Sequence, residues 1–156
     1  MRKALTLTFA VVAAATMALA ADNTLGTWKR NNAKSKGAPR VSPITNEIVT
    51  REAADGGAKI TVKGERADGS KIDYVFNAKY DGTPVMVMGT GPAYDTVAIK
   101  QVNANTLTDT RTKKGTKYHV TARTVVSADG KTLTTTTKGT NADGKPITAT
   151  AVFDKQ

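Results

Sequence analysis

Apolar and polar side chains alternate one by one along most of the chain after residue 20. In the segment 71–80, one side of the alternation holds Ile72, Tyr74, Phe76, Ala78 and Tyr80. The segment 117–126 repeats the pattern with Tyr118, Val120, Ala122, Thr124 and Val126. A period of two places each set on one face of a β-strand, and the abundance of Thr and Val suits a pleated sheet. No segment after residue 20 shows convincing helical spacing, so the sequence predicts an all-β fold.

The alternating segments are separated by a recurring Asp-Gly pair, which is a strong signal for a tight turn because both residues tolerate positive φ angles. The pair occurs at Asp55-Gly56, Asp68-Gly69, Asp81-Gly82, Asp129-Gly130 and Asp143-Gly144. Neighbouring pairs are 13 or 14 residues apart in the two regular stretches, which corresponds to one strand plus one turn. Counting the segments predicts nine or ten strands, near residues 25–30, 44–53, 58–66, 71–80, 84–89, 95–102, 105–112, 116–126, 131–139 and 146–154.

Short connections between successive strands imply an antiparallel up-and-down meander. A long meander with one apolar face buries that face best by closing into a barrel, which also removes the exposed edges. We therefore predict a barrel of about 8–10 strands, with a two-sheet sandwich as the alternative. The first connection, 31–43, is polar and contains several Lys and Arg residues. We interpret it as a basic flap beside one mouth of the barrel.

The first 20 residues have a different pattern, that of a secretory signal peptide. Arg2 and Lys3 supply a positive start, an apolar stretch follows, and Ala18-Leu19-Ala20 forms a small-residue cleavage site. A membrane anchor is the rival interpretation, but the apolar run is shorter than the roughly 20 residues that span a bilayer. We predict cleavage after Ala20, a single domain over residues 21–156, no membrane span in the mature form, and a periplasmic or secreted location.

The chain is basic, and this bears on its partners. Lys and Arg number 23 against 13 Asp and Glu, which gives a net charge of +10, and removal of Arg2 and Lys3 with the signal peptide lowers it to +8. A basic balance is typical of proteins that bind nucleic acid, anionic lipid or acidic polysaccharide. The charges alternate along the chain without forming a block, however, which favours a role in solubility, and we predict no nucleic-acid partner. The chain has no cysteine, which excludes disulfides, thiol chemistry and cysteine zinc sites.

The segment Leu25-Gly26-Thr27-Trp28-Lys29 resembles the first strand of the calycins, the β-barrel group that includes the lipocalins and the intracellular fatty-acid-binding proteins. The segments 128–133 and 150–155 are similar in layout to the last hairpin of the fatty-acid-binding proteins. The chain also resembles small exported bacterial proteins of uncharacterised function with a Gly-Thr-Trp-Lys opening. The resemblance implies a barrel whose closed end is covered by Trp28. The Arg-x-Tyr with which fatty-acid-binding proteins hold a carboxylate is replaced here by Ala151 and Phe153, so the resemblance does not extend to fatty-acid binding.

No catalytic, metal or cofactor motif stands out in the sequence. His119 is the only histidine, and its spacing from Lys117 and Arg123 places it on the polar face of its strand. With one His and no Cys, a multi-histidine metal site within one chain is excluded, and no Gly-x-Ser-x-Gly elbow is present. We predict that the protein is not an enzyme and has no catalytic residue, no metal site and no cofactor.

The predicted strand 105–112 is unusual because it offers two different inward faces. Leu107, Asp109 and Arg111 share one face, and four threonines share the other. If the threonines face inward, both charges lie in water. If Leu107 faces inward, Asp109 and Arg111 follow it and must pair, since an unpaired buried charge is costly. The second orientation predicts an internal ion pair that meets a polar group of a ligand.

Many of the inward positions are small, among them Ala78, Ala122, Ala149 and Ala151. Such side chains fill a ten-stranded lumen poorly at normal packing density, so we predict an exported, lipocalin-like protein that binds a small apolar or amphipathic ligand in its lumen. The residues predicted to line the ligand site are Tyr74, Phe76, Tyr80, Tyr118, Val120, Phe153, Asp109 and Arg111. The alternative is an envelope interaction protein that binds an acidic polymer or a protein partner through its basic surface, with the flap residues Lys29, Arg30, Lys34, Lys36 and Arg40.

Overall fold

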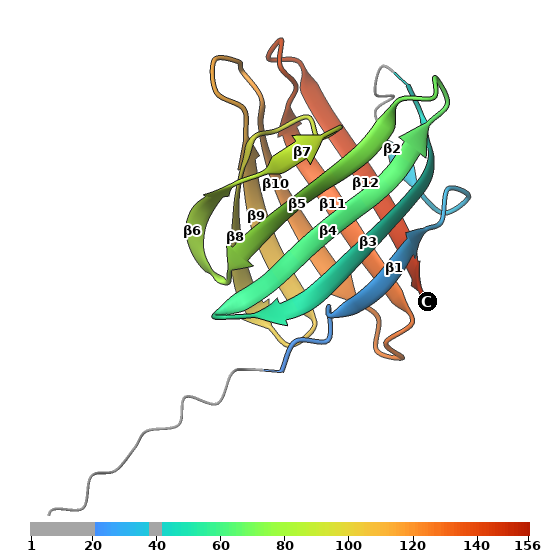
Figure 1. Cartoon of the computed structure of the whole chain (residues 1–156), viewed down its shortest axis with the longest axis vertical. Coiled ribbons are helices and arrows are strands. Elements are labelled where there is room, and N and C mark those ends of the chain that lie inside the picture. The colour runs from blue at the N-terminus through green and yellow to red at the C-terminus, as the bar shows by residue number, and fades with distance from the viewer. Residues whose placement is uncertain (1–20, 38–41) are drawn as a thin grey trace, which may run out of the picture.

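All regular structure in the described part of the chain is β-strand. A computed structural model describes residues 21–37 and 42–156, so the predicted signal peptide 1–20 and the flap residue Arg40 lie outside the described residues. The strands form one antiparallel sheet rolled into a barrel (Figure 1), which confirms the predicted fold. They are β1 (Gly26–Arg30), β2 (Lys36–Gly37), β3 (Ile44–Ala54), β4 (Gly57–Arg66), β5 (Lys71–Lys79), β6 (Asp81–Met86), β7 (Met88–Thr90), β8 (Thr96–Asn103), β9 (Thr106–Thr112), β10 (His119–Val126), β11 (Thr132–Thr140) and β12 (Pro146–Lys155).

The barrel closes at a seam between the two edges of the sheet. The strand order is β6-β8-β9-β10-β11-β12-β1-β3-β4-β5-β7, so the edges are β6 and β7, which follow each other in the chain. β6 pairs with β8, whereas β7 pairs with β5 on the other side of the seam. Between them, Val87 donates its N–H to the carbonyl of Asp95 at 2.9 Å. One stretch of chain thus changes its pairing partner at Val87 and leaves the barrel nearly closed (Figure 1).

The observed strands follow the predicted ones closely, with two differences. The predicted strand 84–89 is divided into β6 and β7 by the change of partner, and the flap contains the short strand β2, which pairs with β12. Four of the five Asp-Gly pairs lie between successive strands, and Gly130 has the positive φ of 71° that such a turn requires. The fifth pair, Asp81-Gly82, begins β6 at a bulge.

The interior of the barrel is filled unevenly. Apolar side chains of β4, β5, β8, β9 and β10 form the larger part of the core, in which Ile60, Val97 and Leu107 are at most 2% exposed. A second cluster surrounds Trp28 at one end of the barrel. Along the middle of β11 and β12 the interior positions are threonine and alanine, namely Thr135, Thr137, Ala149 and Ala151, because the alternation places small residues there. The barrel is therefore packed on the side of β4, β5 and β8–β10 and around Trp28, but less filled beside the middle of β11 and β12.

Candidate ligand cavity

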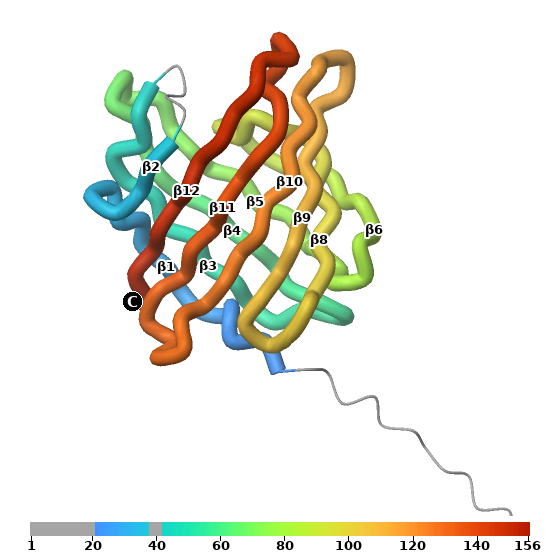
Figure 2. Tube along the Cα trace, turned by 180° about the vertical axis from the view of Figure 1, so that it is seen from behind, coloured from blue at the N-terminus to red at the C-terminus, as the bar shows by residue number. Residues whose placement is uncertain are grey.

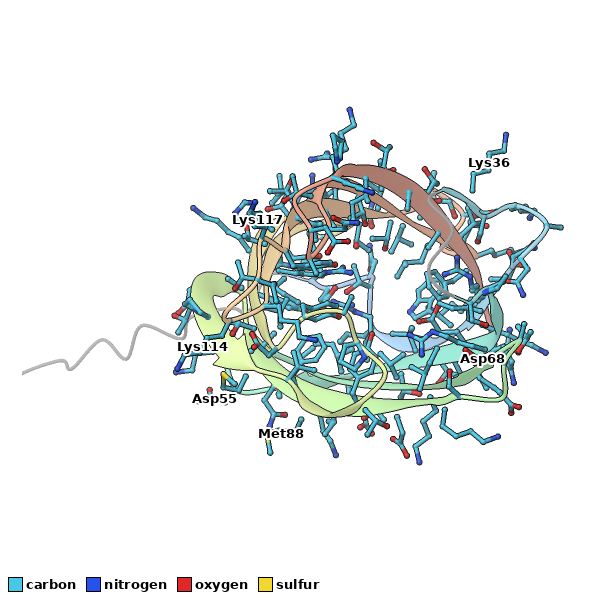
Figure 3. All side chains as sticks on the ribbon, turned by 90° about the horizontal axis from the view of Figure 1, so that it is seen from above. Lys36, Asp55, Asp68, Met88, Lys114 and Lys117 are labelled. Atoms are coloured by element: carbon cyan, nitrogen blue, oxygen red, sulfur yellow. The ribbon has the colours of Figure 1, made fainter. Side chains whose placement is uncertain are left out.

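A cavity of about 730 Å³ lies inside the barrel, against its small-residue wall. Thr135, Thr137, Ala149 and Ala151 of β11 and β12 border it on one side, and residues of the packed core border it on the other. It extends to the end of the barrel formed by the loops around residues 42–43 and 91–92. Figure 3 looks along the barrel from this end, with Asp68 at the rim and Lys36 pointing away from the wall.

The opposite end of the barrel is closed by the segment that precedes β1 and by Trp28. Asn23 donates its N–H to the carbonyl of Ala104 at 2.8 Å, which holds this segment across the barrel end. The Trp28 indole is fully buried and donates its Nε1–H to the carbonyl of Thr24 at 2.9 Å. The Lys155 ammonium lies 5.1 Å from the centre of the indole ring, a cation–π contact. Trp28 therefore lies at the closed end, and the cavity opens at the other end.

Asp109 and Arg111 both point into the barrel, so the second of the two orientations considered for this strand is the observed one. Arg111 donates two hydrogen bonds to Asp109, from Nε to Oδ1 at 2.6 Å and from Nη2 to Oδ2 at 3.0 Å. The Asp109 residue is only 7% exposed, and both residues border the cavity. Burial by itself lowers the pKa of Arg111, but the attraction of the Asp109 carboxylate, together with Tyr94 and the hydrogen bonds to Asp109, holds that pKa well above its ordinary value. The pair is thus a charged, bidentate feature of the cavity wall.

A cluster of aromatic rings lies beside the Asp109–Arg111 pair. The guanidinium carbon of Arg111 is 5.1 Å from the ring centre of Tyr94. Tyr94 packs edge-on against Tyr74, with ring centres 6.2 Å apart, and stacks on Tyr118 at 6.4 Å. Burial, reinforced by the neighbouring Tyr94, raises the pKa of Tyr74 well above its ordinary value, so the hydroxyl remains a proton donor. These contacts give the cavity a rigid aromatic wall next to a charge pair.

A second ion pair lies in the cavity wall, formed by Arg30 and Glu47. The Arg30 Nη1 atom is 3.0 Å from Oε2 of Glu47, and the Glu47 residue is 8% exposed. The guanidinium carbon of Arg30 also lies 5.9 Å from the ring centre of Phe153. The cavity therefore combines two Arg–carboxylate pairs with apolar and aromatic surface.

Arg51 borders the cavity without a carboxylate within ion-pair distance. It is 9% exposed, and among residues 21–37 and 42–156 it takes part in none of the ion pairs. Its Nε donates to Oγ1 of Thr24 at 3.2 Å, and its Nη2 donates to the Tyr80 hydroxyl at 3.4 Å. The nearest negative charge in this network is Asp22, which accepts a hydrogen bond of 2.7 Å from the same Tyr80 hydroxyl. The positive charge of Arg51 is thus only indirectly compensated.

Five of the eight predicted lining residues border the cavity: Tyr74, Phe76, Phe153, Asp109 and Arg111. The other three do not border it. Tyr118 and Val120 are buried in the packed core, and Tyr80 extends towards the segment before β1. Alternation identifies the inner face of a strand, but it does not tell whether an inner side chain meets empty space or another side chain.

Sequence reasoning missed Arg30, Glu47, Arg51 and Tyr94 as cavity residues. The sequence contained a signal for two of them. Glu47, Val49 and Arg51 are spaced two residues apart along β3, so all three lie on its inner face. Tyr94 lies on the loop between β7 and β8, where no periodic pattern indicates a direction.

The described part of the flap is held against β12. Asn31 donates its N–H to the carbonyl of Val152 at 2.8 Å, and the N–H of Val152 donates to Oγ of Ser35 at 3.0 Å. Gly37 has a φ of 134°, and a Cβ at this position would lie 2.4 Å from the Cα of Ala149. Only glycine allows β2 to approach β12 so closely. The flap therefore forms part of the cavity entrance.

The basic residues of the flap are less available than the alternative function requires. Arg30 turns inward to Glu47, and the Lys34 ammonium lies 3.6 Å from Oδ1 of Asp154. Lys29 and Lys36 remain exposed. Two of the four described flap cations are thus already paired.

No protein-family model and no curated protein matches the chain. Within residues 21–37 and 42–156, no helix is long and apolar enough to cross a membrane. The function is accordingly inferred from the barrel and its cavity.

Proposed function

We propose that the protein is exported after cleavage at Ala20 and binds one small amphipathic molecule in the barrel cavity, without catalysing a reaction. The observation that carries this proposal is the cavity of about 730 Å³ with one closed end. Small-molecule sites are typically about 300–1,000 Å³ and are mostly apolar with a few convergent polar groups. The resemblance of the segment around Trp28 to the first strand of the calycins supports the same role.

The two kinds of surface in the cavity favour an amphipathic ligand over a purely apolar one. Partly exposed apolar residues of the cavity wall, such as Ile44, Val49 and Ala151, provide contact area, which stabilises binding by about 25 cal/mol per Å² removed from water. The Arg30–Glu47 and Asp109–Arg111 pairs lose hydration when a ligand displaces water from them, and this is costly unless the ligand provides hydrogen bonds. A molecule with an apolar body and polar groups satisfies both surfaces.

The position of Arg51 favours an acidic group on the ligand. A buried cation is stabilised by a nearby anion and by hydrogen bonds that saturate its donors. Thr24 and Tyr80 accept hydrogen bonds from Arg51, but neither provides negative charge. We place the acidic group of the ligand at Arg51, towards the closed end of the cavity.

Phenylalanine substitutions on the two faces of β11 test the cavity as the binding site. Thr137 borders the cavity, whereas the adjacent Thr136 is exposed on the outer face. We expect the protein to bind the fluorescent probe anilinonaphthalene sulfonate, which has an apolar body and an acidic group. Thr137→Phe should weaken this binding, because its ring occupies part of the cavity, and Thr136→Phe should leave it unchanged. Far-ultraviolet circular dichroism verifies that both variants fold.

Two results would contradict the cavity proposal. The first is probe binding by the folded Thr137→Phe protein with the affinity of the unsubstituted one. The second is a loss of probe binding in the Thr136→Phe protein that the Thr137→Phe protein does not show, which would place the probe on the outer surface.

A further inference from the structure

The outward side chains of β8–β11 include several cations and no carboxylate, although Asp81 of the neighbouring strand β6 lies opposite Lys100 in the strand register. Lys100, Arg123 and Lys138 are exposed on it, and their side chains form no ion pair or hydrogen bond within the described structure. No outward position of these four strands is Asp or Glu, and most of the others are threonine: Thr96, Thr108, Thr110, Thr112, Thr121, Thr132, Thr134, Thr136 and Thr140. We call the outward side chains of β8–β11, with these three cations at their centre, the basic face.

The strand register arranges the basic face in rows. Lys100 is paired with Thr108, Thr108 with Arg123, and Arg123 with Thr136 across four neighbouring strands. Lys138 occupies the adjacent row, opposite Thr121. Neighbouring strands lie about 4.7–4.9 Å apart, so the Cα atoms of Lys100 and Arg123 are about 10 Å apart along the row. The hydroxyl of Thr108 lies between the two residues. Figure 2 shows β8 to β12 side by side across this side of the barrel.

A shallow groove lies between these side chains. Its volume is about 650 Å³, and its walls include all three cations together with Thr108, Thr110, Thr121 and Thr136. The groove is separate from the cavity because β9 alternates between the two surfaces. Asp109 and Arg111 point inward, whereas Thr108 and Thr110 belong to the outer groove. A ligand on the basic face therefore leaves the cavity free.

The opposite outer face, formed by β3–β5, has a different charge pattern. Three of its four lysines lie directly across from carboxylates in the strand register: Lys59 from Glu52, Lys63 from Asp73, and Lys71 from Glu65. The positive excess is therefore concentrated on one side of the barrel. A requirement for solubility alone does not explain this asymmetry, because it acts on every exposed face alike.

We propose that the basic face binds a linear anionic polysaccharide. The three cations complement acidic groups along such a chain, and the threonine rows can exchange hydrogen bonds with the sugar hydroxyls between them. Single-stranded nucleic acid is disfavoured because proteins bind it by stacking bases on aromatic side chains, and none of the outward side chains of β8–β11 is aromatic apart from the single imidazole of His119. This surface also differs from the flap that the sequence suggested for an acidic polymer.

Two triple variants with the same change in net charge test this proposal. Lys100→Gln, Arg123→Gln and Lys138→Gln together neutralise the basic face. Lys59→Gln, Lys63→Gln and Lys79→Gln together remove three exposed charges from the opposite side. Binding of the purified protein to a polygalacturonate oligosaccharide is measured by isothermal titration calorimetry at low and high salt, with a malto-oligosaccharide as the neutral comparison.

We expect salt-sensitive binding of the polygalacturonate oligosaccharide and none of the neutral one. The basic-face variant should bind about tenfold or more weakly, the combined effect of three exposed ion pairs of ordinary strength, and the opposite-face variant should change by less than about threefold. The Thr137→Phe protein should bind the polysaccharide normally, because Thr137 borders the cavity and not the groove. The polysaccharide proposal can therefore be tested even if the cavity proposal fails.

Three results would overturn the proposal. They are the absence of binding at low salt, an equal loss of affinity in the two triple variants, and binding of single-stranded DNA that is as tight as binding of the polysaccharide. The second would mean that net charge alone decides affinity, and the third would assign the face to nucleic acid.

Discussion

The internal Asp109–Arg111 pair provides the sharpest test of how the cavity wall is built. Asp109→Ala removes the carboxylate and leaves a guanidinium that is mostly buried, with 19% of its side chain exposed. Breaking one partner of a buried pair costs about 3–5 kcal/mol. Because Arg111 borders a cavity that water can enter, we expect the lower end of this range, about 3 kcal/mol in the free energy of unfolding.

Replacing both partners should be much less costly than replacing one. In the double variant Asp109→Leu, Arg111→Met, no charge is left without a partner, and apolar side chains of similar size often replace buried ion pairs at little cost. We expect a loss below about 1 kcal/mol. The single variants Asp109→Leu and Arg111→Met complete the double-mutant cycle, which should give a coupling energy of about 2 kcal/mol or more between the two residues.

Urea unfolding followed by circular dichroism measures these values. With a slope of about 2 kcal/mol per M, a loss of 3 kcal/mol lowers the unfolding midpoint by about 1.5 M. Asp73→Ala is the matched control, since Asp73 is exposed on the outside of β5, and its effect should stay below about 0.5 kcal/mol. The reasoning would be refuted if Asp109→Ala behaved like Asp73→Ala, or if the double variant lost as much as the single one.

Three further predictions concern the closed end, the ligand and the aromatic wall. Trp28→Ala should lower the free energy of unfolding by about 3–5 kcal/mol in the same urea assay, because it empties a fully buried site; a loss below 1 kcal/mol would contradict its place in the core. Arg51→Gln should weaken binding of anilinonaphthalene sulfonate about tenfold and leave its neutral analogue phenylnaphthylamine unaffected, since only the first carries the acidic group; an equal effect on both probes would remove Arg51 as the anchor. In a spectrophotometric titration, Tyr74 should ionise above the ordinary tyrosine pKa of about 10. A tyrosine whose pKa is raised in the folded state contributes stability that declines as the pH rises above about 10. If all four tyrosines ionised together near pH 10, the prediction for Tyr74 would be contradicted.

The parts of the fold that depend on neighbours in sequence were predictable. The period-two alternation gave the correct inner faces of β4, β5 and β10, because side-chain direction in a strand is decided by the backbone itself. Four of the five Asp-Gly pairs located hairpins for a similarly local reason, as Gly130 illustrates. A chain of such hairpins has few ways to bury a continuous apolar face, so the closed barrel followed from them.

The features that sequence reasoning missed depend on contacts between distant segments. The change of partner at Val87 depends on β5, which is distant in the sequence. Gly89 allows β7 to approach β5, since a Cβ at this position would lie 2.2 Å from the carbonyl oxygen of Asp73, but a glycine alone does not indicate which strand it faces. The two possible faces of β9 could not be separated from the sequence, since an inward Asp109 is acceptable only when Arg111 reaches it. Tyr118 was placed on the correct face, but whether it borders the cavity depends on Tyr94, which lies on a loop and stacks on its ring.

Native mass spectrometry of the protein purified from the cells that produce it tests the central claim most directly. We predict a discrete added mass that is lost on denaturation and is less abundant in the Thr137→Phe protein than in the Thr136→Phe protein. Solvent extraction of the released material should yield an acidic amphipathic molecule. A protein that carries only its own mass, and that also fails to bind anilinonaphthalene sulfonate, would contradict the proposal that this barrel is a carrier.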